Sequence, residues 1–232
     1  MPIPKTPLYM MGMLEHYHYW WWRKNAESQN FVNDWNAKQK AIFVHIPKTA
    51  GTSIRRFIGM QDVSDTHAPA LSYYQQDPEL FEEAFLFTFV RNPWDRFASS
   101  FHFLKSGTVW PMQQKWADEN IGDMDFDQFT RKLRQPLFRA KVKAERFFWP
   151  QSFWFKHTEH LRDFDRIYRF ERLDEAFADL SKRFGGPNGT QIPHERKVER
   201  APYTAIYTDQ TREIVSNLYA DDIDRFDYAF GE

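Results

Sequence analysis

Two short apolar runs, each followed by a polar loop and a helical pattern, restrict the fold more than any other feature of this chain. They read AIFVH at 41–45 and AFLFTFV at 84–90. Uninterrupted apolar runs of this length are typical of strands that are buried on both faces of a parallel sheet. A third strand is predicted at 165–171, where the chain reads DRIYRFE. Strands that alternate with helical patterns indicate an α/β fold.

Apolar residues at helical spacing mark the segments that follow these strands. One helix is predicted from about Thr52 and another from Pro93, because proline is tolerated in the first turn. A third is predicted over 173–184, with a stop at the glycine pair 185–186. A last helix is predicted over 209–219.

The composition limits the class of protein. The chain has 232 residues, enough for one sizeable domain with a full hydrophobic core. Lys and Arg number 31 and Asp and Glu number 32, which argues against a nucleic-acid binder that works through bulk charge. Cysteine is absent, so neither a disulfide framework nor a thiolate metal site is expected. No run of about 18 apolar residues and no signal-peptide pattern occurs, so no membrane span is expected.

The first 40 residues differ in composition from the rest, and we expect the folded domain over 41–232. The segment HYHYWWWRKN at 16–25 is aromatic, then basic, and too short to cross a membrane. Two interpretations stay open: the rings pack against the domain's own core, or they contact a membrane surface or a partner protein.

The loop after the first strand is rich in hydrogen-bond donors. It consists of Lys48, Thr49, Ala50, Gly51, Thr52 and Ser53. A helix that begins here would present main-chain N–H groups and a partial positive charge, which suits a phosphate or a sulfate. An ordinary strand-to-helix turn with hydroxyl caps is the alternative. The order differs from G-x-x-x-x-G-K-[ST], because Lys48 precedes the glycine, and this disfavours a nucleotide kinase.

A second loop supplies another predicted anion site. Arg91 follows the second strand, and Ser99 lies eight residues further along, inside the predicted helix. An arginine fork and a serine hydroxyl suit a phosphate dianion. Because ligands of open α/β sheets bind beyond the carboxyl ends of the strands, two such loops imply a ligand with two separated anionic groups.

The sequences HIPKTAGTSI (45–54) and FTFVRNPWDRFASSF (87–101) resemble the 5′- and 3′-phosphate motifs of sulfotransferases that use 3′-phosphoadenosine 5′-phosphosulfate (PAPS). The most similar branch contains the Golgi carbohydrate sulfotransferases and many short bacterial members. Further similarity in matching order extends the resemblance over about 41–230. It implies a P-loop-like three-layer fold, with a central, mainly parallel sheet flanked by helices. It also implies transfer of a sulfuryl group from PAPS to a hydroxyl or an amine, with a carbohydrate or glycolipid hydroxyl favoured.

The resemblance also implies roles for particular residues. Residues 48–53 would hold the 5′-phosphosulfate, and Lys48 would in addition neutralise charge on the leaving phosphate oxygen. Arg91 and Ser99 would hold the 3′-phosphate. Arg196 and Lys197, in the loop HERK at 194–197, would close over the nucleotide, unless this is a solvated run of charges.

A general base is expected as well, because an acceptor hydroxyl must lose its proton near neutral pH. His67 lies between the two anion loops, in the interval where relatives often place a base histidine, and it is our candidate, with an ordinary surface-loop histidine as the alternative. Asp62, Asp65 and Glu79 are carboxylate alternatives. His45, inside the first strand, is expected to be a packed residue.

The acceptor site is the least constrained part. Gln151 would orient the cofactor or the acceptor, or bond its own turn. Substrate choice is expected in loops at 106–124 and 136–163, which are rich in aromatic and basic residues.

No metal-binding pattern occurs. The size and the missing anchor favour a cytoplasmic, bacterial enzyme. A nucleotide-dependent kinase and a non-catalytic nucleotide-binding docking module are the alternative functions.

Overall fold

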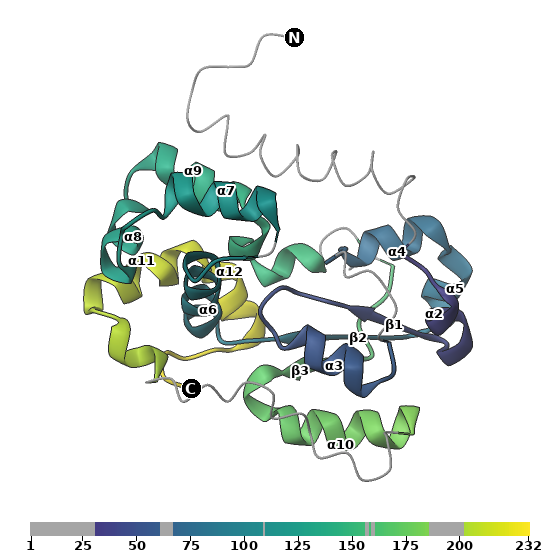
Figure 1. Cartoon of the computed structure of the whole chain (residues 1–232). Helices are drawn as coiled ribbons and strands as arrows, with labels where there is room; N and C mark the ends of the chain where they lie inside the picture. Colours follow the sequence, from purple (N-terminus) through teal and green to yellow (C-terminus); the bar gives the residue numbers. More distant parts are fainter. Residues whose placement is uncertain (1–30, 61–66, 109, 156–157, 159–160, 186–201) are drawn as a thin grey trace. The chain divides into compact units, whose positions relative to one another are not determined.

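A computed structural model of the chain describes residues 31–60, 67–108, 110–155, 158, 161–185 and 202–232 (Figure 1). The described residues divide into two compact units. The sheet unit comprises residues 31–91 and 151–185, and the helical unit comprises residues 92–150 and 202–232. The two expected anion loops begin in the sheet unit. His194, Arg196 and Lys197, together with Asp62, Asp65 and the segment 16–25, lie outside the described residues.

The sheet unit is built on three parallel strands in the order β1-β2-β3. These are β1 (Ala41–Val44), β2 (Phe85–Val90) and β3 (Arg166–Arg169). Ala41 pairs with Phe85 at one end of the sheet, and Val90 pairs with Arg169 at the other. The prediction of a parallel α/β sheet is therefore confirmed, and all three strands lie within the predicted segments.

Helices connect and cover these strands. In chain order they are α2 (Asp34–Gln39), α3 (Gly51–Phe57), α4 (Ala70–Gln76), α5 (Pro78–Glu83), the 3-10 turns η2 (Gln151–Trp154) and η3 (Phe170–Arg172), and α10 (Leu173–Phe184). Helix α10 ends as predicted at Gly185, which adopts the left-handed conformation with φ 61°. Figure 1 shows α3 and α10 on one side of the sheet and α4 on the other.

The core between the sheet and helices α3 and α10 is mainly aromatic. Phe43 on β1 stacks on Phe87 of β2 with ring centroids 5.1 Å apart. Phe57 of α3 meets Phe177 of α10 edge to face at 4.6 Å. Aromatic pairs of this kind add to the stabilisation that comes from the burial of apolar area. This core fixes the place where α3 begins, which lies within the donor-rich segment 48–53, so residues 51–53 of that segment form the first turn of the helix.

The helical unit contains the segments on either side of the sheet unit's last strand. Its helices are α6 (Pro93–Lys105), α7 (Pro111–Asn120), α8 (Phe126–Lys132), α9 (Pro136–Ala144), α11 (Asp209–Leu218) and α12 (Ala220–Phe226), with 3-10 turns η1 (Arg146–Phe148) and η4 (Tyr203–Ile206). Phe97, Phe101 and Leu104 on α6 are buried, as their helical spacing predicts. The last predicted helix is followed directly by α12, which the sequence pattern did not reveal.

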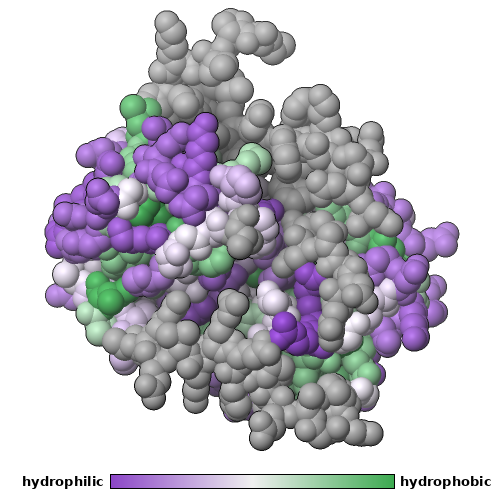
Figure 2. All heavy atoms as spheres, viewed as in Figure 1, coloured by the Kyte–Doolittle hydropathy of each residue, from purple (hydrophilic) through white to green (hydrophobic). Residues whose placement is uncertain are grey.

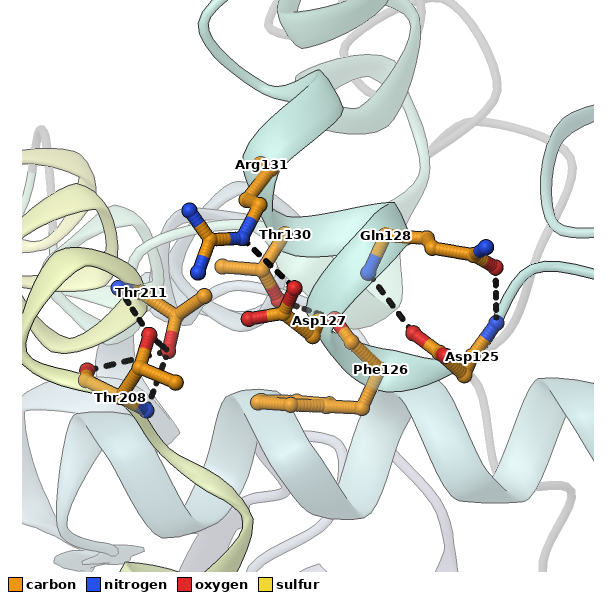
Figure 3. Close-up of polar contacts among 8 residues, drawn as sticks. All are labelled: Asp125, Phe126, Asp127, Gln128, Thr130, Arg131, Thr208 and Thr211. Atoms are coloured by element: carbon orange, nitrogen blue, oxygen red, sulfur yellow. Dashed lines mark hydrogen bonds and ion pairs between the residues drawn. The ribbon is translucent and has the colours of Figure 1, made fainter.

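Capping boxes set the start of two of these helices (Figure 3). The Asp125 carboxylate accepts from the main-chain N–H of Gln128, whose own side chain accepts from the N–H of Asp125. Thr208 and Thr211 make the equivalent exchange at the start of α11. Such reciprocal bonds satisfy N–H groups that a helix leaves without an internal partner.

The prediction that 106–124 and 136–163 are loops is wrong for much of their length. Helix α7 occupies the middle of the first segment, and α9 begins the second. Pro111 and Pro136 stand at the first helical positions, and Phe138 and Val142 are buried on one face of α9. Aromatic and basic side chains are therefore carried on helices here.

On the face seen in Figure 2, polar residues prevail among the described residues. Figure 2 shows hydrophilic residues prevailing over α7 and α9, with apolar atoms in small separate areas. Trp110, Met112, Leu137 and Ile167 are the large apolar side chains that stay exposed among the described residues. No helix in the described ranges is both long and apolar enough to cross a membrane.

Candidate functional site

The first donor-rich loop connects β1 to α3 in a strained main-chain conformation. Lys48 and Ala50 have φ angles of 69° and 66°, in the left-handed region that residues with a Cβ atom rarely adopt. Each such residue costs on the order of 1–3 kcal/mol and persists only where its surroundings enforce it, typically at functional sites. Ala50 is the N-cap of α3, and it has no side chain that could cap the helix. The loop is therefore shaped by contacts from outside itself.

One of these contacts explains Gly51. Its φ angle is not positive, so a special main-chain conformation does not require glycine at this position. A Cβ atom on residue 51 would instead lie 1.7 Å from Nε2 of His45. Glycine is needed because the imidazole of His45 packs directly against the first residue of α3.

The polar side chains of the loop differ in their surroundings. The Thr49 hydroxyl is buried and donates to the carbonyl of Ile46 at 2.8 Å, so it stabilises the main chain between β1 and α3. Lys48 and Ser53 are partly buried, and Thr52 is exposed. Lys48, Thr52 and Ser53 are therefore the side chains of this loop that retain access to solvent.

His67 lies against this loop although 22 residues separate it from His45. Its Nδ1 atom is 3.2 Å from the carbonyl oxygen of His45, and the two imidazole centroids are 4.3 Å apart. The indole N–H of Trp154 donates to the carbonyl of His67 at 3.1 Å. His67 has a φ angle of 47° and is 6% exposed. Its buried position differs from that of an ordinary surface-loop histidine.

Arg91 reaches the same loop from the end of β2. Its Nη1 atom donates to the carbonyl of Lys48 at 3.0 Å. The guanidinium carbon lies 4.0 Å from the ring centroid of Phe170, just after β3. The main-chain N–H of Arg91 donates to Oε1 of Gln151 at 2.8 Å, and its carbonyl accepts from Nε2 of Gln151 at the same distance. Arg91 is thereby held by three segments of the sheet unit.

The structure thus brings residues 48–53, His67, Arg91 and Gln151 together within the sheet unit. Ser99 lies buried on α6, in the helical unit. Glu79, the one carboxylate candidate among the described residues, is exposed in the first turn of α5. In the described part of the chain, no three His, Asp or Glu side chains gather as a metal site would require.

Three contacts of the site were not anticipated from the sequence. They are the packing of His45 on Gly51, the stacking of Arg91 on Phe170 and the bond from Trp154 to His67. The sequence signal nearest to these contacts was Gln151, which lies three residues before Trp154 in η2. Nothing in that spacing indicates which main-chain groups the side chains meet.

Comparison with known proteins identifies the family of the chain. A family model described as "Sulfotransferase family" matches residues 34–229, which is most of the chain and includes both anion loops. Neither a curated protein nor a solved structure matches the chain at a significant level. The likeness of the two loops to PAPS-binding motifs is therefore supported by a match that spans both units, and the chain belongs to the sulfotransferase family, whose members transfer sulfuryl groups and generally use PAPS.

Proposed function

We propose that this sulfotransferase moves a sulfuryl group from PAPS to an acceptor hydroxyl by in-line transfer, with His67 as the general base. One observation carries the proposal. Two side chains with separate expected roles contact main-chain carbonyls of the connection between β1 and α3: His67 contacts that of His45, and Arg91 contacts that of Lys48. A base and an anion-binding arginine therefore converge on the segment that would hold the sulfuryl donor.

The residues of the loop fit the anionic end of PAPS. Lys48 supplies a full positive charge, and Thr52 and Ser53 supply hydroxyl donors that are not buried. The start of α3 carries no side-chain cap from Ala50. When bound, PAPS would provide the activated sulfuryl group. Transfer then asks the protein chiefly for positioning and for stabilisation of charge that develops on the leaving phosphate, which is the role proposed for Lys48.

The proposed role of His67 follows from the contact at Nδ1. A carbonyl oxygen only accepts hydrogen bonds, so the bond to His45 requires a proton on Nδ1 of His67. In the neutral ring, Nε2 then carries the lone pair and is able to take a proton from an acceptor. The bond to the carbonyl of His45 favours this tautomer of the neutral ring, and the bond from Trp154 to the main chain of His67 holds the residue in place.

The remaining nucleotide contacts are proposed from the family likeness. Arg91 and Ser99 would hold the 3′-phosphate, and Arg196 and Lys197 would close over the nucleotide. We propose a carbohydrate or glycolipid hydroxyl as the acceptor on the same basis.

Calorimetric titration with the product PAP, and separately with ATP and Mg²⁺, tests the donor. Wild type should bind PAP, and Lys48→Ala and Arg91→Ala should each weaken PAP binding by about tenfold to a hundredfold, the loss expected for one charge-assisted hydrogen bond. The exposed residues Lys115 and Arg134 supply the matched controls Lys115→Ala and Arg134→Ala, which should bind PAP as wild type does. Absence of PAP binding, or preference for ATP, would contradict the proposal and favour a kinase.

The base is tested with His67→Gln. This variant should bind PAP with little change, while sulfuryl transfer in a screen of carbohydrate acceptors should fall by about 10²–10⁴. Unchanged turnover would exclude His67 as the base. PAP binding by wild type without turnover on any acceptor would favour the docking module.

A further inference from the structure

The main chain of Arg91 lies where the sheet ceases to supply hydrogen-bond partners. The last pair between β1 and β2 is Val44 with Thr88, and the last pair between β2 and β3 is Val90 with Arg169. Arg91 follows directly. A residue at this point needs other partners for its N–H and C=O groups, because buried main-chain groups without partners are costly.

Gln151 supplies both partners with one side chain. Its Oε1 atom accepts from the N–H of Arg91, and its Nε2 atom donates to the C=O of Arg91, each at 2.8 Å. The primary amide thereby imitates a neighbouring strand and extends the pairing of β2 by one residue. Gln151 is 0% exposed, so water cannot replace these bonds when the side chain is lost. A glutamine that uses both amide groups on one residue holds that residue's main chain in place.

The guanidinium at the other end of Arg91 is equally constrained. It lies 4.0 Å from the centroid of Phe170 and donates to the carbonyl of Lys48. Lys48 is one of the two loop residues in the left-handed conformation. A shift of the Arg91 main chain would therefore displace both the guanidinium and the bond that holds Lys48. Trp154, in the same 3-10 turn as Gln151, holds His67.

We propose that Gln151 is a positioning residue that acts through the main chain of Arg91 and sets the preference of the site for a 3′-phosphorylated nucleotide. The inference rests on the proposed role of Arg91 in holding the 3′-phosphate. It assigns Gln151 to the cofactor rather than to the acceptor. On this proposal the influence of Gln151 is carried by its two bonds to Arg91 and not by a direct contact with either ligand.

The test compares the dissociation constants of PAP and AMP, which differ by the 3′-phosphate alone. The ratio of the two constants measures the preference, and it requires neither an acceptor nor turnover. Wild type should prefer PAP. Gln151→Met, which keeps the volume and removes both bonds, should reduce the preference by at least about tenfold, toward the value of Arg91→Ala. Gln151→Glu keeps the acceptor for the Arg91 N–H and should give an intermediate value.

Gln114→Met is the matched control. Gln114 on α7 also makes two hydrogen bonds, to the N–H of Thr108 and to the carboxylate of Asp118. Its substitution should leave the preference unchanged, and thermal unfolding should show how far either substitution destabilises the chain. This control separates the loss of any bonded glutamine from the loss of the one that holds Arg91.

The outcomes separate the two proposals. If wild type does not prefer PAP to AMP, the proposed function fails. If wild type prefers PAP and both Gln151 variants keep that preference, even with both affinities weakened equally, Gln151 has only a structural role and the inference is overturned. It is overturned as well if neither Gln151 variant folds while Gln114→Met does.

Discussion

Gly51 and His45 pack directly against each other in the candidate site. The imidazole of His45 occupies the space that a Cβ atom on residue 51 would need, and the same ring lies 4.3 Å from the ring of His67. A change at Gly51 must therefore move His45 and, with it, the residue proposed as the base. The loop and the base respond to one substitution because a single side chain lies between them.

Gly51→Ala should destabilise the protein by about 1–3 kcal/mol, the usual effect of overpacking, and should weaken PAP binding. Adding His45→Ala should recover part of the lost stability, because the added methyl group then finds room. Gly59→Ala is the comparison: no atom lies within 4 Å of a Cβ there, and its cost arises from a φ of 74°. Thermal unfolding of the single and double variants measures the coupling. A rescue of Gly59→Ala by the same second change would contradict the steric explanation.

Glu145 is a buried carboxyl in the helical unit, where it precedes η1 and accepts from the N–H of Phe147. Burial raises the pKa of Glu145 above the ordinary 4.5, although the bonds to the main chain and the charge of Arg146 act in the opposite direction. Between the ordinary and the raised pKa the folded state binds more protons than the unfolded state. The contribution of Glu145 to stability is thus greatest below pH 4.5 and falls as the pH rises through the raised pKa.

Glu145→Gln should therefore be more stable than wild type at pH 7, because the amide keeps the acceptor and carries no charge. The advantage should shrink as the pH falls toward 4.5. Urea unfolding of both proteins from pH 4 to pH 8 is the measurement. If the variant is less stable than wild type at pH 7 and matches it only at higher pH, the pH dependence is opposite to the one expected. That result would contradict burial as the dominant effect on Glu145.

Among the secondary-structure elements, the end of α5 depends on one distant arginine. Nη1 of Arg162 donates to three carbonyl oxygens at the end of this helix, those of Phe81, Glu82 and Ala84. Nη2 pairs with Asp165, whose carboxylate also accepts from the N–H of Leu86 in β2. The guanidinium therefore satisfies carbonyl groups that the helix leaves unpaired, and it connects α5 to the start of two strands.

Arg162→Lys should cost about 1–3 kcal/mol, because an ammonium cannot reach three carbonyls and a carboxylate in one plane. Arg134→Lys, on an exposed arginine, should change the free energy of unfolding by less than about 0.5 kcal/mol. Urea unfolding provides both values. Equal effects of the two substitutions would show that Arg162 acts as an ordinary surface charge.

For the chain as a whole, the segment before β1 contributes to the folded sheet unit. Phe31 is buried, the indole N–H of Trp35 donates to the carbonyl of Ile58, and the amide of Asn36 donates to the carbonyl of Ala41. The described part of the segment that was expected to be an extension, residues 31–40, thus packs against the first strand and its neighbours.

A chain that begins at Ala41 should accordingly be less stable than a chain that begins at Phe31, by at least about 3 kcal/mol, the usual cost of losing a large buried aromatic side chain. Trp35→Phe in the full chain should cost about 1 kcal/mol, since it keeps the ring and loses the bond to Ile58. Circular dichroism melts of the two shortened chains, the full chain and its Trp35→Phe variant test this. Equal melting temperatures for the two shortened chains would show that residues 31–40 add nothing to the fold.

Local patterns in the sequence were sufficient to predict the parallel sheet and four helices, of which α3 and α10 pack on the sheet, whereas α2, α4 and α5 were not predicted. An apolar run such as AIFVH and a stripe such as Phe97, Phe101 and Leu104 report burial directly, because a strand or a helix repeats within a few residues. Helices α7 and α9 were interpreted as loops because their segments are rich in aromatic and basic residues. Pro111 and Pro136, which stand at the first helical positions, were the signals for a helix. A segment's composition is a weaker guide than the residue at its first turn.

The identity of the loop residues and of Arg91 could also be predicted, because motifs of contiguous residues carry the likeness to PAPS-binding loops. The arrangement of the site could not. Arg91 meets Lys48 across 43 residues, Gln151 meets Arg91 across 60, and His67 meets His45 across 22. A motif specifies which groups are present, whereas hydrogen bonds between distant segments depend on how the strands and turns pack. The tertiary structure therefore decided that Gly51 packs against the imidazole of His45 and that Gln151 hydrogen-bonds the main chain of Arg91.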